Sequence, residues 1–172
     1  MASPHANLPD AEALVSALAA MIKADITPDT VLVGIHTGGV WLAERLQVLL
    51  GISAPLGTLD ITFYRDDFDE RGLHRDAKRS TIPFDVAGKD IILVDDVLYT
   101  GRTIRAAMNE LFDYGRPARI RLAVLVDRQS RELPIGAQFV GMTMPVPDDE
   151  MLVLERSESG KLTFKQTKKE PR

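Results

Sequence analysis

The chain has 172 residues, of which 45% are hydrophobic and 27% charged, so it can fold as one soluble domain and is too short for two. Its formal net charge of −4 argues against a general nucleic-acid-binding surface, which is more often basic. It has no cysteine, no signal-peptide pattern at the N-terminus and no apolar run of membrane-spanning length, which predicts a cytoplasmic protein with no membrane segment.

The first predicted elements are a helix, a buried strand and a second helix. Residues 1–9, like the tail at about 160–172, are expected to be loose ends of a single domain, and Asp10 can cap the first helix. The unbroken apolar run at 31–35 is typical of a strand covered on both faces of a parallel sheet. The second helix follows a short glycine loop. Its apolar positions are Val40, Leu42, Leu46, Leu49 and Leu50.

The loop between that strand and that helix contains Thr37, Gly38 and Gly39. Two glycines let a backbone approach a phosphate closely, and the N–H groups at a helix start attract anions. Alone, a Thr-Gly-Gly loop is more often a turn than a binding site. His36 precedes the loop and can be read as the last residue of the strand or as a general base.

The next segment changes from alternating to charged residues. Residues 58–64 alternate polar and apolar side chains, which predicts an edge or half-exposed strand. Residues 65–79 are almost wholly charged and cannot bury enough apolar surface to stay ordered without a partner. They can form either a solvated hairpin tip or a lid that closes over a charged substrate.

The most informative stretch is residues 91–103. An apolar run at 91–94 predicts another buried strand, and residues 100–103 open a segment with helical periodicity. Strand, hydroxylic loop and helix start together form a cradle for an anion. Asp95 and Asp96 follow the strand directly, and two carboxylates do not suit a site for phosphate alone. They suit a sugar phosphate with Mg²⁺, which offers hydroxyls, a cation and developing positive charge.

The last predicted strands complete the sheet. Residues 120–126 form an apolar strand, and Asp127 and Arg128 stand at its carboxyl end, where open α/β sheets bind ligands. A surface ion pair is the alternative role for Arg128. A short strand at 138–140 and an apolar run at 151–154 follow. Strands alternating with helices predict an α/β fold with an open parallel sheet, covered by helices on both faces and joined by right-handed crossovers.

The string Val-Leu-Tyr-Thr-Gly-Arg-Thr at 97–103 resembles the binding signature for 5-phosphoribosyl-1-diphosphate (PRPP) of the type I phosphoribosyltransferases. It is most similar to the PyrR family of pyrimidine-operon regulators and uracil phosphoribosyltransferases, as is the string at 125–128. The similarity covers about residues 10–155 and implies a phosphoribosyltransferase-type fold with a small hood and a flexible loop. The residues of this string that it implies in binding PRPP or UMP are Val97, Leu98, Tyr99, Thr100, Gly101, Arg102 and Thr103.

The resemblance also implies a reaction, in which uracil and PRPP give UMP and diphosphate with Mg²⁺ as cofactor. The ribose becomes cation-like in the transition state, so Asp95 and Asp96 would hold its hydroxyls and stabilise that charge. Arg128 and the loop at 37–39 would neutralise the departing diphosphate together with Mg²⁺, which the acidic pair can also contact. Met151 stands where an aliphatic residue of the family's hood covers the base.

Two further features bear on this resemblance. The family carries its flexible catalytic loop where residues 65–79 stand, which favours the lid. Gly38 stands where the regulators usually have arginine and His36 where they often have lysine, whereas purine-salvage enzymes have glycine at the position of Gly38. The residues that match the opening of the flexible loop are Tyr64, Arg65 and Asp66.

Two alternatives to the uracil enzyme stay open. The main role can be that of an RNA-binding attenuator, which senses UMP and binds the leader transcript of pyrimidine genes, or the enzyme can use another base. An arginine cluster favours RNA, but residues 142–150 carry three acids and no basic residue. We therefore predict enzymatic activity with weak or absent binding of leader RNA, in a homo-oligomer that is a dimer or a tetramer. The cluster is Arg105, Arg116, Arg119, Arg121 and Arg131.

Overall fold

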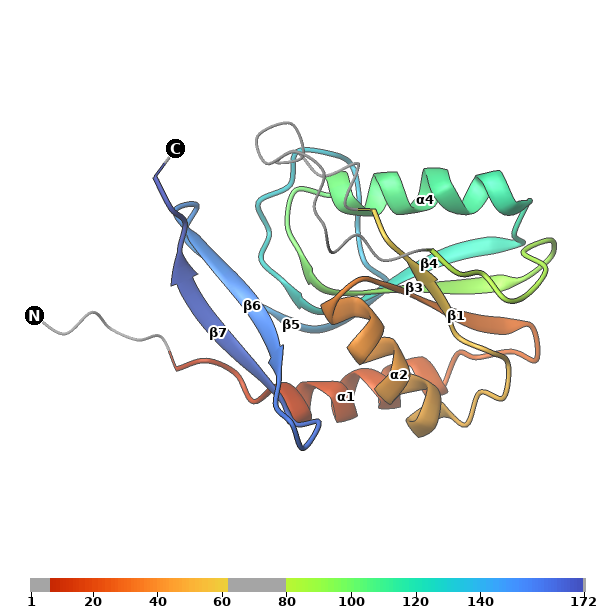
Figure 1. The fold of residues 1–172 in the computed structure, drawn as a ribbon, viewed down its shortest axis with the longest axis horizontal. Coiled ribbons are helices and arrows are strands. Elements are labelled where there is room, and N and C mark those ends of the chain that lie inside the picture. Colours follow the sequence, from red (N-terminus) through yellow and green to blue (C-terminus); the bar gives the residue numbers. More distant parts are fainter. Residues whose placement is uncertain (1–6, 62–79, 172) are drawn as a thin grey trace, which may run out of the picture.

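The computed structural model describes residues 7–61 and 80–171 of the chain (Figure 1). Its centre is a parallel sheet of five strands in the order β2-β1-β3-β4-β5, and an antiparallel pair, β6 and β7, lies to one side. The helices described are α1 (Ala11–Lys23), α2 (Gly38–Leu50) and α4 (Arg102–Tyr114). The strands are β1 (Thr30–Ile35), β2 (Gly57–Leu59), β3 (Asp90–Leu98), β4 (Arg119–Asp127), β5 (Phe139–Thr143), β6 (Glu150–Arg156) and β7 (Leu162–Lys168).

The sheet separates two apolar layers. Figure 1 shows α4 on one face of the sheet and α1 and α2 on the other. Neighbouring side chains of a strand point to opposite faces, so Leu32 and Ile92 pack in the layer of α1 and α2, whereas Val31 and Ile91 pack in the layer of α4. β1 is buried along its whole length. The predicted parallel sheet, covered on both faces, is confirmed.

The start of α1 follows from its sequence. The carboxylate of Asp10 accepts hydrogen bonds from the backbone N–H groups of Glu12 at 3.0 Å and Ala13 at 3.3 Å, which is the predicted N-terminal cap. One face of the helix then turns to the sheet, because its apolar residues recur every three or four positions. The buried residues of α1 are Ala11, Val15, Leu18, Ala19 and Ile22.

The hairpin of β6 and β7 is the hood that the resemblance implies. Buried residues alternate with exposed ones along both strands, and the buried face, with Leu152, Leu154, Leu162 and Phe164, packs on the layer of α1 and α2. The expectation of a loose tail from about residue 160 is wrong for β7, which pairs with β6 from Leu162 to Lys168. The alternation of buried Leu162 and Phe164 with polar residues accounts for this strand.

The strands at the sheet edges are short. β2 has three residues and β5 has five. β2 confirms the first part of the edge strand predicted at 58–64, and residues 62–79 lie outside the described part of the chain. Within residues 7–61 and 80–171, no helix is long and apolar enough to cross a membrane.

Candidate functional site

The loop after β1 and the end of β3 meet at one edge of the sheet. β1 and β3 are parallel neighbours, with Gly34 aligned with Val94, so the residues that follow these two positions emerge on the same side. A Cβ built on Gly39 would lie 2.5 Å from the carbonyl oxygen of Val94, and one on Gly38 would lie 2.9 Å from Cγ of Asp96. Side chains do not fit at these distances, so the two glycines let the loop lie against the acidic pair.

The acidic pair lies within β3, because this strand continues past its apolar run to Leu98. Asp95 is buried, with 6% of its surface exposed, and its Oδ1 accepts a hydrogen bond from the N–H of Asp96 at 2.9 Å. Asp96 is half-buried, its Oδ1 accepts from the N–H of Val97 at 2.9 Å, and its Oδ2 lies beside Gly38. The backbone therefore fixes both carboxylates, one at greater depth than the other.

The connection from β3 to α4 consists of Tyr99, Thr100 and Gly101, and the helix begins at Arg102. Gly101 has a φ of +94°, and a Cβ there would lie 3.0 Å from the side chain of Ile135, so this position favours glycine. Oγ1 of Thr100 accepts a hydrogen bond from the N–H of Arg102 at 3.2 Å. The first N–H groups of a helix lack intrahelical partners and lie at the positive end of its dipole. This geometry suits a phosphate.

The residues around this connection differ in what they can offer a ligand. Leu98 is buried in the layer of α4, so only its backbone groups can reach a ligand, whereas Val97 packs against the layer on the other face and is half-buried. Thr103 lies in the first turn of α4 and is half-buried. Arg102 is exposed, and its Nε lies 3.3 Å from a carboxylate oxygen of Glu132.

Arg131 holds the connection between β3 and α4 in place through hydrogen bonds. Its Nη1 donates to the carbonyl of Tyr99 at 3.0 Å and its Nε to that of Ile135 at 2.7 Å. Nη1 and Nη2 also donate to the carboxylate of Asp127, at 2.9 and 2.6 Å. Burial would raise the pKa of Asp127, but the hydrogen bonds from Arg131 and the N–H of Gln129 outweigh it, so the pKa lies below its usual range. This role is not predicted from the sequence, where its only signal is the four-residue spacing of Asp127 and Arg131.

Arg128 is buried, with 4% of its surface exposed, and its guanidinium faces the protein. Nη2 donates to the carbonyls of Val146 and Pro147, each at 3.0 Å, and Nη1 donates to that of Glu150 at 3.2 Å. The guanidinium carbon lies 3.8 Å from the centre of the Tyr99 ring. Arg128 thus lies against carbonyls and an aromatic ring of the chain, which differs from the contact with a diphosphate expected from the family resemblance.

Met151 lies on the outer face of the hood. The alternation of β6 places Met151 and Val153 opposite the buried Leu152 and Leu154, and Met151 is 46% exposed. An exposed apolar side chain on the hood is available to cover a flat base. That Met151 does so stays a prediction.

His36 follows β1 directly, and its N–H donates to the carbonyl of Leu59 at 2.9 Å. The peptide bond between His36 and Thr37 is cis. These contacts place His36 at the strand end, which is one of its two predicted readings. The flexible-loop residues Tyr64, Arg65 and Asp66, with the rest of the charged run at 65–79, lie outside the described residues.

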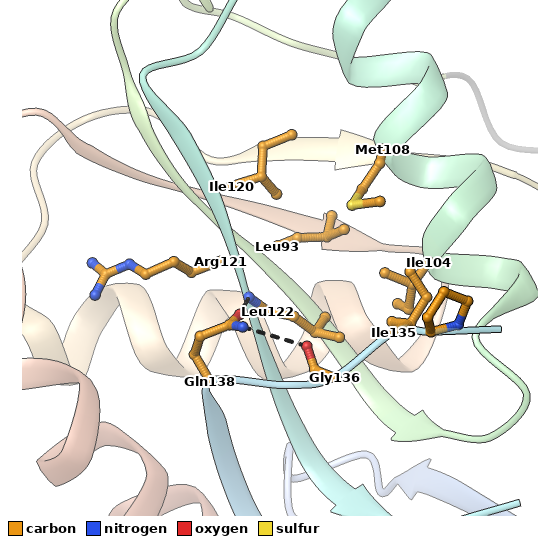
Figure 2. A pocket seen from close by; sticks show the side chains of 10 residues that line it. Leu93, Ile104, Met108, Ile120, Arg121, Leu122, Ile135, Gly136 and Gln138 are labelled. Atoms are coloured by element: carbon orange, nitrogen blue, oxygen red, sulfur yellow. Dashed lines mark hydrogen bonds between the residues drawn. The ribbon is translucent and has the colours of Figure 1, made fainter. Parts of the chain in front are cut away.

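A cavity of about 230 Å³ lies beneath α4, away from the acidic pair. Figure 2 shows it between α4, from which Ile104 and Met108 point inward, and the segment that carries Ile135 and Gly136. Most of the residues that line it are apolar, with Arg121 and Gln138 as the polar ones, and the side-chain amide of Gln138 contacts the carbonyl of Gly136 at 3.5 Å. Its lining includes neither the glycine loop at 37–39 nor the acidic pair nor residues 99–103, so this cavity is not the candidate site.

Known proteins resemble the chain in sequence over most of its length. The family described as "Phosphoribosyl transferase domain" matches residues 6–153. A protein of Pseudomonas aeruginosa named "Bifunctional protein PyrR" is 49% identical over 152 residues, which cover 86% of this chain and 89% of that protein. A protein of the same name from Pseudomonas fluorescens is 47% identical over 152 residues, covering 86% and 90%.

Solved structures resemble the chain in fold. A hypoxanthine phosphoribosyltransferase from Staphylococcus aureus superposes with a TM-score of 0.66 at 21% identity, covering 87% of this chain and 81% of that one. A purine phosphoribosyltransferase from Pyrococcus horikoshii gives a TM-score of 0.60 at 28% identity, covering 78% and 84%. The fold class predicted from the sequence agrees with both comparisons.

Proposed function

The chain belongs to the PyrR family of phosphoribosyltransferases, and from this premise we propose that it transfers the phosphoribosyl group of PRPP to uracil, giving UMP and diphosphate. The observation that carries the proposal is the meeting of three parts at one sheet edge. These parts are the diglycine loop after β1, the acidic pair of β3 and the connection that opens α4. Each of them suits a different portion of PRPP.

The acidic pair suits the ribose. In this displacement the bond from C1 of the ribose to diphosphate breaks while the bond to the base nitrogen forms, and the ring becomes cation-like. Asp95 and Asp96 would accept hydrogen bonds from the ribose hydroxyls and favour the developing charge electrostatically. The burial of Asp95 strengthens this effect, because charges interact more strongly away from water. The mechanism requires no nucleophilic side chain.

The two anionic ends of PRPP suit the two loops. The N–H groups from Tyr99 to Thr103, with the hydroxyls of Thr100 and Thr103, would hold the 5′-phosphate at the start of α4. The diphosphate would lie against the loop of Thr37, Gly38 and Gly39, where the absence of side chains allows close approach of the backbone. The diphosphate is attached to C1 of the ribose, so the groups that hold the ribose must lie beside this loop, and the acidic pair does.

Mg²⁺ is the cofactor that we propose to accompany PRPP. Among residues 7–61 and 80–171, no group of three or more His, Cys, Asp or Glu side chains is arranged to hold a metal ion. Mg²⁺ commonly keeps several waters and binds one or two carboxylates together with substrate phosphates. Asp95 and Asp96 could supply those carboxylates, and the ion would neutralise charge on the departing diphosphate.

A base-specificity assay tests this function. We expect kcat/KM with PRPP to be highest for uracil when uracil, orotate, hypoxanthine and guanine are compared, and we propose that Met151 covers the base. A purine as the preferred substrate would replace the uracil assignment with that of a salvage enzyme. Absence of product with every base would overturn the transferase reaction itself.

The name of the relatives, "Bifunctional protein PyrR", favours a second candidate function. This function is the UMP-sensing regulation of pyrimidine genes through leader RNA. It uses the same nucleotide site, because UMP is the product of the transfer. Both functions are proposed for a cytoplasmic homo-oligomer, and titration of leader RNA with and without UMP separates them.

A further inference from the structure

Arg128 contacts two parts of the candidate site that come from separate stretches of the chain. On one side its guanidinium donates three hydrogen bonds to the segment that leads into β6, at the carbonyls of Val146 and Pro147 and of Glu150, the first residue of that strand. On the other side it lies over the ring of Tyr99, the first residue after β3. A single buried side chain therefore joins the start of the hood, at residues 146–150, to the connection at 99–101 that opens α4, which we call the phosphate cradle.

A second set of contacts joins the same two parts nearer the surface. The hydroxyl of Tyr99 donates to Oδ1 of Asp148 at 3.4 Å. Lys169, just after β7, donates from its Nζ to the carbonyl of Asp148 at 2.6 Å and from its backbone N–H to that of Asp149 at 2.8 Å. Its Nζ also lies 5.1 Å from the centre of the Tyr99 ring. Tyr99 is thus in contact with two cations, Arg128 just after β4 and Lys169 just after β7.

The burial of Arg128 favours a structural role over direct contact with diphosphate. A buried cation is costly unless its donors are satisfied, and removing its partners leaves that cost uncompensated. Both terminal nitrogens already donate to carbonyls. Nε has no hydrogen-bond partner within the described residues, and it is also buried. A diphosphate could reach this group only if the loop at 146–150 moved away.

We propose that Arg128 is a positioning residue that couples the hood to the phosphate cradle, so that the groups facing the base and the 5′-phosphate are held in one arrangement. This inference rests on the proposed function, because it assigns those two parts to one nucleotide. It also means that Arg128 does not bind the diphosphate. UMP carries a base and a 5′-phosphate but no diphosphate, so its binding depends on the coupling, whereas the binding of free diphosphate does not.

The test compares Arg128→Met and Arg128→Lys with a control, Arg116→Met, which removes an exposed arginine just beyond α4. Calorimetric titration measures the affinity of each protein for UMP and for inorganic diphosphate with Mg²⁺. Arg128→Met is expected to weaken UMP binding by about tenfold or more, since hydrogen bonds to charged groups contribute on that order. Diphosphate binding is expected to stay unchanged, and Arg128→Lys to lie between Arg128→Met and wild type.

Hydrogen exchange on the ligand-free proteins tests the coupling without any substrate. In Arg128→Met the amides at 146–150 and those at 99–103 are expected to exchange faster together, and in Arg116→Met neither segment changes. Lys169→Met alters an exposed side chain and so keeps the test valid if Arg128→Met does not fold. It is expected to weaken UMP binding by a smaller factor, again with diphosphate binding unchanged.

Loss of diphosphate binding with UMP binding retained would overturn the positioning role and make Arg128 a diphosphate ligand. Faster exchange in only one of the two segments would also overturn it. A wild-type protein that binds neither UMP nor diphosphate would contradict the proposed function instead. In that case the exchange of the two segments would still decide whether Arg128 couples them.

Discussion

The side chain of Asp96 occupies the space into which a side chain at the position of Gly38 would project. A Cβ on Gly38 would lie 2.9 Å from Cγ of Asp96 and 3.2 Å from its Cβ, and the carboxylate oxygen Oδ2 is nearer still. It follows that the residue at position 38 controls the direction of a carboxylate that we assign to the ribose.

Gly38→Ala is expected to displace the Asp96 carboxylate and lower kcat/KM for uracil and PRPP by about 10²-fold, the loss that a 1 Å misplacement in an active site can cause. Gly136→Ala is the matched control, because a Cβ at that position meets nothing within 4 Å. Steady-state kinetics of both variants measure the effect. Equal rates for the two would mean that Asp96 moves aside without consequence for catalysis.

Asp95→Asn and Asp96→Asn are each expected to lower kcat more than they weaken PRPP binding. The negative charge of each carboxylate matters most when the ribose is cation-like, and loss of one such interaction costs on the order of 3 kcal/mol, or about 10²-fold in rate. The measurement is kcat and KM for PRPP in both variants. A raised KM with unchanged kcat would indicate uniform binding and contradict this role.

The parts of the site that follow one another in the chain could be predicted from the sequence. The apolar run at 91–94, the two aspartates and the hydroxylic loop form consecutive structure, since the signal for each is local. The cap at Asp10 and the glycine loop at 37–39 were predictable for the same reason. Parallel pairing then brings the ends of β1 and β3 together without any further information.

The contacts of Arg128 and Arg131 could not be predicted in this way. An arginine after a strand can face a ligand, the solvent or its own chain, and the sequence does not distinguish these. The carbonyls that accept from Arg128 lie 18 to 22 residues later in the sequence, and Tyr99, whose carbonyl accepts from Arg131, lies 32 residues earlier. β7 could not be predicted because only two of its residues, Leu162 and Phe164, are apolar and the strand is stabilised by pairing with β6.

At the other end of β3, Asp90 lies in a network of charges. Its carboxylate accepts hydrogen bonds from Nε of Arg119 at 2.7 Å, Nη2 of Arg121 at 2.9 Å and Oγ1 of Thr30 at 2.8 Å. Burial would raise the pKa of Asp90, but the hydrogen bonds from Arg119 and Thr30 and the charges of both arginines outweigh it and lower the pKa. The folded protein therefore holds the proton of Asp90 less tightly than the unfolded chain.

Asp90→Asn is expected to lower the free energy of unfolding near pH 7 by on the order of 2 kcal/mol, because it removes one of the two carboxylates that pair with the buried Arg121 and leaves only the exposed Asp25. The contribution of Asp90 is complete above the unfolded pKa of about 3.9 and is lost as pH falls through the lower folded pKa. The wild-type advantage should therefore shrink only in acid. Denaturant unfolding at several pH values measures it, with the exposed Asp113→Asn as control. A pH-independent difference would contradict this assignment.

The arginine cluster that could bind RNA is smaller in the structure than in the sequence. Arg121 is 8% exposed and forms ion pairs with Asp90 and Asp25. Arg131 is held by Asp127. Neither guanidinium is available for a phosphate without breaking these pairs. The exposed members of the cluster are Arg105, Arg116 and Arg119, and of these Arg119 also pairs with the carboxylate of Asp90.

We therefore predict that the chain binds leader RNA weakly and that enzymatic activity is its main role. Each neutralised phosphate of a single strand contributes about −0.7 to the slope of log K against log salt, so the slope is expected to be no steeper than about −2 even if all three exposed arginines reach phosphates. The test is titration of a pyrimidine-leader hairpin at several salt concentrations, with and without UMP. Arg105→Gln should make the slope shallower by about 0.7. Tight binding at physiological salt, strengthened by UMP and with a much steeper slope, would require a basic surface beyond these three arginines and would make attenuation the main role.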